Sequence, residues 1–531
     1  MYWLYGFIAV FGASCLLKRM LFKASRPGTQ MLMPLHLPFE IIAISVIMGS
    51  SGIVASVTKY FRRSRYLYCG LFGKHYYADS LASADRFLCQ PAHTLDNLPL
   101  LWTSHVRCFG GEASQDTYDK FFGHCRELLV AVERHFLGEK NSTSVIQDSN
   151  VEAKITSLVS IAEGFPESGE NRKYWERYAK PKQVSPDSVD VDLARLVRDL
   201  TAHVALEVIY GRDFLDRNPG FINDMWIFVD NAFDLLLAGL PRWTPLGPIR
   251  VGVDACERIR TALMAYYKRV EQHQLNKPID QGADMSDVSA TVLERSTIYL
   301  DKGFTLRQRA DLDMGVAFGS STNTPVLSFW YIVHLFSRPD LLSQVRKEVA
   351  PHVVVTRNQA TGKPEISSMN HAALYHECPL FKSALLETAR LSGGSTPIRY
   401  VNRLTHATTA EGTAHVLRPG TWVTVPSGNV QMDPLVYPFP DDFVPDRFIV
   451  EDEGKQTARL GQLRIFGSGA GVCKGKTYAI KEALAMVAGI VTLWDVTALD
   501  GNTVVPPLKD SNKIPAQGWF VRVRRRELHS S

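Results

Sequence analysis

The chain has 531 residues, of which 45% are hydrophobic and 21% are charged, so it can bury a large core. Its 59 basic and 54 acidic side chains leave a net charge of +5, which excludes a strongly basic nucleic-acid-binding protein, and we expect no nucleic-acid partner. The eight cysteines form no C-x-x-C pair, which argues against a disulfide framework or a zinc site and favours a reducing compartment.

The N-terminus begins with an uncharged apolar stretch, Tyr2–Leu17, and cations follow it at Lys18, Arg19, Lys23 and Arg26. A secretory signal has its basic residues before the apolar stretch, so the order here is reversed. Residues 20–22 lengthen the stretch toward a membrane span, and the cations behind it favour a cytosolic body. We therefore predict an uncleaved single-pass anchor in residues 1–26 and one catalytic domain in residues 27–531; a buried helix is the alternative.

A second apolar run covers Leu37–Val57. Glu40 and the small residues 49–52 interrupt it, so a membrane-proximal helix is the better interpretation than a second span.

Helical patterns dominate the body of the chain, above all between residues 120 and 350, with Pro-containing loops expected near 179–186 and 241–248. Aromatic residues alternate along Arg65–Asp79, which predicts a β-hairpin. Two further strands are expected within Thr421–Gly428 and Gly518–Glu527. The predicted fold class is mainly α with small β-sheets.

The segment Leu385–Arg403 follows Cys378-Pro379, a typical helix start. Glu387 and Arg390 are three residues apart, so they share one helical face and can pair. Taken alone, such a pair is usually an exposed one that contributes little. Arg447 lies farther on, in an aromatic and Pro-rich loop.

The stretch Phe466–Lys476, "FGSGAGVCKGK", surrounds one cysteine with small residues, which indicates a close backbone approach to another group. It resembles the haem-ligand loop F-x-x-G-x-x-x-C-x-G of the cytochrome P450 family, whose positions are filled by Phe466, Gly469, Cys473 and Gly475. The pair Glu387-x-x-Arg390 and the element 445–448 match two further motifs of the family, which precede the cysteine loop in the same order. Arg390 lies 83 residues, and Arg447 26 residues, before Cys473.

The resemblance implies the P450 fold, haem b as cofactor and Cys473 as the axial thiolate ligand of its iron. It also implies that Glu387, Arg390 and Arg447 form a buried network holding the ligand loop, and that Arg399 binds a haem propionate. One departure is Gly471, which stands where many members carry Arg or His toward a propionate. The turn 393–398 is expected to line the substrate pocket.

The family's oxygen-activating helix corresponds to the region around Gly319–Thr324, "GSSTNT". Matching Trp330 to a family aromatic puts Thr322 at the acid position and Asn323 at the alcohol position; a shift by one places Ser321 and Thr322 there. In either register the usual carboxylate is missing. The stretch with Asn323, Thr324 and Pro325 resembles the sterol and bile-acid hydroxylase and prostacyclin synthase branch, with Pro325 kinking the helix; a plain helix-interior role is the alternative for Asn323.

That branch implies two chemistries, and three functions stay open. The first is a membrane-anchored monooxygenase on the cytosolic face of the endoplasmic reticulum. It would receive electrons from NADPH–cytochrome P450 reductase and oxidise a lipophilic steroid, terpenoid or polyketide-type substrate in specialised biosynthesis. The second is an isomerase or dehydratase of oxygenated lipids that needs no reductase. The third is a non-catalytic haem-binding sensor or carrier. We favour the monooxygenase.

Overall fold

The computed structural model describes residues 68–69, 75–77, 85, 87–160, 172–237, 239–393, 397–408, 414–424, 431–499 and 518–527. The predicted anchor in residues 1–26 and the apolar run Leu37–Val57 lie outside this part of the chain. Two compact units are present. Unit 1 comprises residues 1–100, 396–430 and 467–471, and unit 2 comprises residues 101–395, 431–466 and 472–531.

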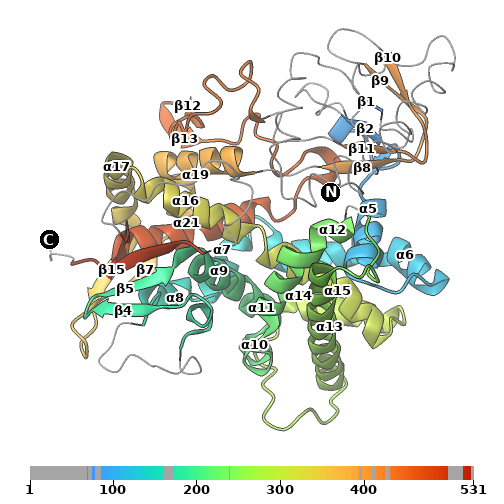
Figure 1. Cartoon of the computed structure of the whole chain (residues 1–531), viewed down its shortest axis with the longest axis horizontal. Coiled ribbons are helices and arrows are strands. Elements are labelled where there is room, and N and C mark those ends of the chain that lie inside the picture. The colour runs from blue at the N-terminus through green and yellow to red at the C-terminus, as the bar shows by residue number, and fades with distance from the viewer. Residues whose placement is uncertain are drawn as a thin grey trace, which may run out of the picture. The chain divides into compact units, whose positions relative to one another are not determined.

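Helices form most of the described structure, as the sequence predicts (Figure 1). Short π-helical turns extend several of them. The helical elements are α5 (Leu98–Thr103), η1 (Ser104–Cys108), α6 (Gln115–Val132), η2 (Glu133–Leu137), α7 (Ser142–Asp148), α8 (Val151–Thr156), η4 (Tyr174–Glu176), α9 (Leu193–Tyr210), α10 (Arg212–Arg217), α11 (Phe221–Phe228), η5 (Val229–Phe233), α12 (Asp234–Leu237), α13 (Gly247–Gln274), α14 (Ala290–Asp301), α15 (Leu306–Ser321), α16 (Thr324–Phe336), α17 (Pro339–Val349), η6 (Ala350–His352), α18 (His371–His376), α19 (Pro379–Ser392), η7 (Gly469–Gly471) and α21 (Lys476–Leu493).

Strands are short and gather in small sheets, again as expected. They are β1 (Tyr68–Cys69), β2 (His75–Tyr77), β3 (Leu95–Asp96), β4 (Lys182–Ser185), β5 (Ser188–Asp192), β6 (Val353–Arg357), β7 (Pro364–Met369), β8 (Ile398–Val401), β9 (Thr405–Thr408), β10 (Ala414–Leu417), β11 (Trp422–Thr424), β12 (Ile449–Asp452), β13 (Lys455–Ala458), β14 (Trp494–Ala498) and β15 (Phe520–Arg525).

Unit 1 holds a five-stranded sheet in the order β1-β2-β11-β8-β3. The predicted hairpin is confirmed, because β1 and β2 pair antiparallel with Tyr68 opposite Tyr77. β11 lies inside the predicted strand segment Thr421–Gly428 and pairs with β8.

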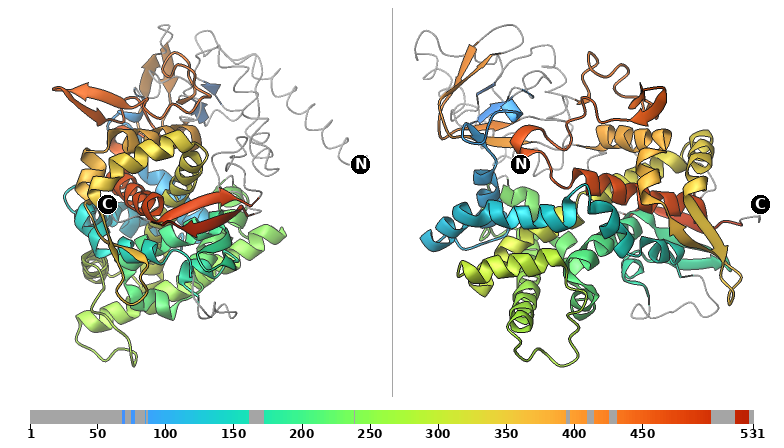
Figure 2. Two further views of the ribbon diagram at one scale, coloured as in Figure 1. Left: turned by 90° about the vertical axis from the view of Figure 1, so that its left-hand side faces the viewer. Right: turned by 180° about the vertical axis from the view of Figure 1, so that it is seen from behind.

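Unit 2 holds a four-stranded sheet in the order β14-β15-β5-β4, at the opposite end of the unit from α6 (Figure 2). β15 confirms the strand expected within Gly518–Glu527. The expectation of a plain loop near 179–186 is wrong, because β4 forms there and pairs with β5. β5 also pairs with β15, with Val191 opposite Val521. Because these two strands lie far apart in the chain, no local sequence pattern contains their pairing.

The core of unit 2 surrounds α21 and α16, which lie against each other, while α19 packs on both (Figure 1). α16 is buried along most of its length and α21 is buried over residues 480–491, because both are apolar around their whole circumference. Lys481 and Glu482 are the polar exceptions within that stretch of α21.

α15 is fixed to its neighbours by buried charges. Arg295 of α14 donates from Nε to Oδ1 of Asp313 at 3.0 Å, and Tyr210 of α9 donates to Oδ2 of the same residue at 2.6 Å. Two residues earlier on α15, Asp311 pairs with Arg260 of α13. These contacts position the helix that leads into "GSSTNT".

Within the described residues, the helices are all too short or too polar to cross a bilayer.

Candidate functional site

Cys473 lies in the turn directly before α21, whose N-cap is Gly475. The backbone N–H of Cys473 donates to the carbonyl of Phe466 at 2.8 Å, which closes the two ends of the loop. The N–H groups of Gly475 and Lys476 donate to the Cys473 sulfur. The side chain is exposed and its thiol is free. The loop therefore presents a sulfur atom that backbone donors support from behind.

The electrostatics of this sulfur combine opposing effects. Although the Cys473 side chain is exposed, the surrounding protein desolvates the sulfur and raises the pKa of the thiol above its ordinary value. The two backbone donors and the charge of Lys476 act in the other direction. A helix N-terminus likewise favours a thiolate. Donors aimed at sulfur are the outer contacts that tune a metal-bound thiolate, so this setting suits one.

The glycines of the loop differ in what a side chain at each position would meet. Gly469 has a φ of +66°, and a Cβ atom there would overlap with the carbonyl of Leu88. A Cβ atom on Gly471 would overlap with the guanidinium of Arg399. At Gly475 a Cβ atom would only make ordinary contact with Leu137, 3.4 Å away. Space therefore requires glycine at position 469, where the neighbour is backbone; at 471 a Cβ atom would have to displace the end of the Arg399 side chain, and at 475 it would displace nothing.

Arg399 comes from β8 and is 5% exposed. Its guanidinium donates to the carbonyls of Ile398 at 3.0 Å and Ser468 at 3.4 Å. Desolvation lowers the pKa of Arg399, and the charges of Asp96 and Cys89 act in the other direction. A buried cation is costly unless anions offset the cost, so this position also suits an anionic group supplied by a ligand.

Glu387 and Arg390 form a bidentate ion pair on α19, with both N–O distances at 2.8 Å. The two residues are 0% and 1% exposed, so the surface-pair alternative is wrong. Arg447 donates to the same carboxylate at 3.0 and 3.1 Å, and the backbone N–H of Val444 adds a bond of 3.0 Å. The structure therefore brings together the three charged side chains singled out in the sequence.

The remaining donors of this network point to backbone carbonyls. Arg390 reaches Gln431, Pro440 and Asp442, and Arg447 reaches Pro438 and Phe439. The carboxylate and its two arginines thus tie α19 to the irregular segment 431–447. The contact to the cysteine loop is indirect: Gly393, at the end of α19, leaves no room for a Cβ atom beside Ile465, which precedes Phe466.

The helix expected at Gly319–Thr324 is broken there. α15 ends at Ser321 and α16 begins at Thr324, with Pro325 in its first turn, as its kinking role predicts. Thr322 is buried, and its hydroxyl donates to the carbonyl of Phe318 at 2.7 Å. Thr324 is also buried, whereas Asn323 is exposed and its amide is 3.5 Å from the Gly319 carbonyl. Of these three side chains, Asn323 is the one open to a bound molecule.

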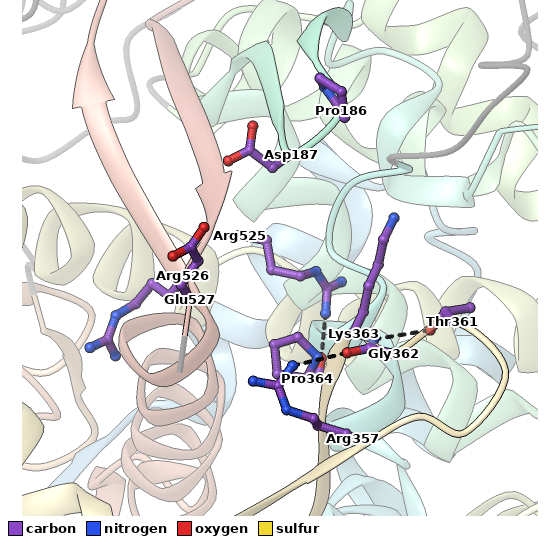
Figure 3. A pocket seen from close by; sticks show the side chains of 10 residues that line it. All are labelled: Pro186, Asp187, Arg357, Thr361, Gly362, Lys363, Pro364, Arg525, Arg526 and Glu527. Carbon is purple, nitrogen blue, oxygen red and sulfur yellow. Dashed lines mark hydrogen bonds between the residues drawn. The ribbon is translucent and has the colours of Figure 1, made fainter. Parts of the chain in front are cut away.

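A pocket of about 360 Å³ opens elsewhere on unit 2, between the turn 186–187, the β6–β7 hairpin and the end of β15 (Figure 3). Its arginines already hold the hairpin together, because Arg357 donates to the Gly362 carbonyl and Arg525 to the Pro364 carbonyl. None of the predicted site residues lines this pocket.

The sequence reasoning missed Glu482 on α21. This residue is 1% exposed, and burial raises its pKa to about 8. The available signal was an acid inside the otherwise apolar stretch "YAIKEALAMVAGIV".

The family model described as Cytochrome P450 matches residues 169–517 of this chain. This range includes the Cys473 loop and the charged side chains of Glu387, Arg390 and Arg447. The chain belongs to the cytochrome P450 family. The family predicted from the Cys473 loop is thereby confirmed.

Curated P450 relatives agree with this assignment. The chain is 27% identical over 310 residues to a cytochrome P450 monooxygenase of Gibberella zeae, covering 57% of this chain and 55% of the relative. It is 26% identical over 338 residues to cytochrome P450 monooxygenase poxD of Penicillium oxalicum, covering 62% and 64%. It is 25% identical over 240 residues to a pig 5-beta-cholestane-3-alpha,7-alpha-diol 12-alpha-hydroxylase, covering 43% and 47%. The chain thus spans less than two thirds of the length of these P450s.

Membership of the P450 family implies a haem, and two observations on the residues present are consistent with a bound haem. The Cys473 sulfur accepts two backbone N–H bonds at a helix start, which suits an iron-bound thiolate. Arg399 is a buried cation whose pKa desolvation lowers, although the charge of Asp96 acts in the other direction, and this suits a further anion such as a propionate. Cys473 belongs to unit 2 and Arg399 to unit 1, so the two observations are independent of each other.

Proposed function

We propose that this P450 is a haem-thiolate monooxygenase that oxidises a lipophilic substrate with dioxygen and electrons delivered by NADPH–cytochrome P450 reductase. The observation that carries the proposal is the Cys473 turn, whose sulfur is backed by the N–H groups of Gly475 and Lys476. When bound, the haem supplies the iron at which dioxygen is activated.

In this proposal Cys473 would hold the haem iron through its thiolate, and Phe466, Gly469 and Gly475 shape the turn that carries it. Arg399 binds a propionate, because desolvation lowers the pKa of this buried cation and a further anion would offset that cost. Glu387, Arg390 and Arg447 keep segment 431–447 in place, and this supports the loop through Ile465 and Phe466. These three residues position the site without contacting the substrate.

At the helix break, Asn323 is assigned to the oxygen side of the site because it is exposed between two buried threonines. Its amide can both donate and accept hydrogen bonds, so it can orient a water molecule or a polar substrate atom. Thr322 and Thr324 are assigned supporting roles, since the Thr322 hydroxyl is engaged with the Phe318 carbonyl.

The substrate class is proposed from the relatives and from the sequence. A 5-beta-cholestane-3-alpha,7-alpha-diol 12-alpha-hydroxylase is among the relatives, which supports a steroid-type substrate. The terpenoid and polyketide-type alternatives, and a role in specialised biosynthesis, are proposed from the sequence resemblance. The membrane anchor in residues 1–26, the endoplasmic-reticulum location and the single catalytic domain in residues 27–531 belong to the same proposal and rest on the sequence pattern. Lys474 and Lys476 beside Cys473 are suited to an acidic reductase surface.

The first test is the absorption spectrum of the reduced, carbon-monoxide-bound protein, which reports a thiolate ligand. Wild-type protein and the control Cys125→Ala are expected to show the thiolate form, and Cys473→Ala is expected to lose it. An unchanged spectrum in Cys473→Ala would remove Cys473 as the ligand.

The second test compares metabolites by accurate mass in the native host expressing wild-type protein or Cys473→Ala. A substrate and product that differ by oxygen atoms, or by loss of two hydrogens, support a monooxygenase. Isomers, or compounds that differ by water, would overturn this proposal in favour of the isomerase or dehydratase.

A further inference from the structure

The pocket between the turn 186–187, the β6–β7 hairpin and the end of β15 has a volume of about 360 Å³ and shares no residue with the proposed haem site (Figure 3). Small-molecule sites often have such a volume, but their walls are mostly apolar. The walls of this one are mainly charged: the cations are Arg357, Lys363, Arg525 and Arg526, and the acids are Asp187 and Glu527. The excess of two positive charges favours a small anionic ligand over a lipophilic one.

The alternation of β15 carries one of these cations inward. Val521 and Val523 are 0% exposed, and Arg525 follows them at the same spacing of two, on the same face of the strand. Its guanidinium carbon lies 4.4 Å from the centre of the Trp494 ring. Desolvation lowers the pKa of Arg525, and no carboxylate among the described residues forms an ion pair with it. An anion that reaches this guanidinium would favour its charged form.

The hydrogen bonds of Arg525 fix its position and leave donors unused. Nη1 donates to the Pro364 carbonyl at 2.6 Å, and Nη2 donates to the Thr156 carbonyl. Nε has no hydrogen-bond partner within the described part of the chain. A guanidinium has five N–H groups, so two bonds to neutral carbonyls hold it in place without using all its donors or compensating its charge. Figure 3 shows the side chain reaching from β15 to the hairpin.

Carboxylates at this end of unit 2 are already engaged. Oδ1 of Asp187 accepts from a serine hydroxyl of its own turn at 2.5 Å. Asp495, on β14, is shared by three guanidiniums, with N–O distances of 2.6 Å to Arg346, 3.8 Å to Arg526 and 3.9 Å to Arg524. One acid therefore serves three arginines, and the region around the pocket keeps an excess of positive charge.

We propose that this pocket binds a small molecule that carries a phosphate group. A phosphate monoester has a charge of about −1.5 to −2 at neutral pH, which matches the excess of two cations in the lining. Arginine donates to phosphate oxygens in a two-pronged manner, and lysine contributes a point charge. Arg525 supplies the fixed guanidinium, while Lys363 and Arg357 approach from the hairpin.

Two sources offer the same phosphate chemistry: a soluble phosphate ester and the headgroup of an anionic lipid. The volume of the pocket leaves room for an organic group beside the phosphate in either case. Because the pocket contains none of the residues assigned to haem or oxygen chemistry, the inference does not rest on the proposed monooxygenase function.

The decisive variant is Lys363→Gln, because this side chain is exposed and its loss is tolerated by the fold. Arg525→Lys is the second variant, which keeps the charge but loses the two-pronged donor. The matched control is Lys277→Gln, which removes the same charge from an exposed lysine that does not line the pocket.

The first readout is calorimetric titration of the whole haem-loaded chain with inorganic phosphate and with glycerol 3-phosphate, at constant ionic strength and with glycerol as the neutral comparison. Saturable binding of one ion per chain is expected in wild type and in Lys277→Gln. Losing one charge-assisted contact should weaken it about 10-fold in Lys363→Gln and in Arg525→Lys. Phosphate binding of equal strength in wild type and Lys363→Gln overturns the inference.

The second readout separates the two sources. The melting temperature of the chain is measured with glycerol 3-phosphate in detergent, and in phosphatidylcholine vesicles with or without phosphatidic acid. Stabilisation by glycerol 3-phosphate that is lost in Lys363→Gln supports a soluble ester. Stabilisation by phosphatidic acid alone, lost in the same variant, supports a lipid headgroup. If neither probe stabilises wild type, the pocket is not a phosphate site. Both readouts are independent of turnover, so they leave the monooxygenase proposal to its own tests.

Discussion

The guanidinium of Arg399 occupies the space that a side chain at Gly471 would need. Both residues belong to unit 1, and the loop carbonyl of Ser468 accepts from the same guanidinium at 3.4 Å. The departure at position 471 is thereby explained in physical terms. A single buried arginine from β8 fills the place beside the loop, and a second large side chain from the loop itself has no room.

Gly471→Ala is expected to push Arg399 away from the loop. Overpacking of this kind typically costs about 1–3 kcal/mol, and we expect a lower melting temperature together with weaker haem retention. The control is Gly123→Ala on α6, where a Cβ atom meets no other atom and the helix gains about 0.5–1 kcal/mol. Thermal unfolding followed by haem absorbance measures both. Equal behaviour of the two variants would contradict the crowding argument.

Arg390→Ala removes one partner of a fully buried charge network. The Glu387 carboxylate would keep Arg447 but lose its bidentate partner, so we expect about 3–5 kcal/mol of destabilisation in chemical unfolding. Arg212→Ala breaks an ion pair whose side chains are 77% and 57% exposed, and it should cost at most about 1 kcal/mol. A loss in Arg390→Ala no larger than this control would mean that the network is dispensable.

Asp313→Asn tests the buried cluster that fixes α15. The substitution leaves the Arg295 guanidinium, which is 2% exposed as a residue, without its carboxylate, and we expect a loss of about 3–5 kcal/mol in urea unfolding. The exposed Asp301→Asn on α14 is the control, and its effect should stay within about 0.5 kcal/mol. If both variants unfold alike, Arg295 finds other partners and the cluster does not anchor the helix.

The stability of the folded chain should depend on pH through Glu482. Below pH 4.5, the ordinary value, the carboxyl is protonated in both the folded and the unfolded chain and contributes no difference. Between pH 4.5 and about 8 the unfolded chain ionises while the folded chain keeps the proton, so the folded state loses relative stability as pH rises. Glu482→Gln cannot ionise and escapes this loss.

Urea unfolding of wild type and Glu482→Gln across this range gives the measurement. The free energy of unfolding of the variant should rise relative to wild type up to about pH 8 and then stay level, with pH 4 as the internal reference. A difference that does not change with pH would show that Glu482 ionises normally in the folded chain.

Local sequence was sufficient wherever one short segment contains the whole feature. Glu387 and Arg390 share a helical face because they are three residues apart. Cys473 precedes α21 because a helical pattern follows directly after the Gly-rich stretch that contains this cysteine. The β1–β2 hairpin is another such case. The strand β4 was missed although it pairs with the neighbouring β5; β5 itself pairs with β15, more than 300 residues away, and no local pattern contains that second pairing.

The sequence by itself determined the family and the chemical identity of the ligand loop, since a cysteine among small residues at fixed spacing is a local property. Only the tertiary structure decided that the pair on α19 is buried, that Arg399 fills the space beside Gly471 and that Glu482 is buried on α21. The reason is physical. Burial and the absence of a counter-ion decide whether a charge persists, and both depend on residues that are distant in the chain.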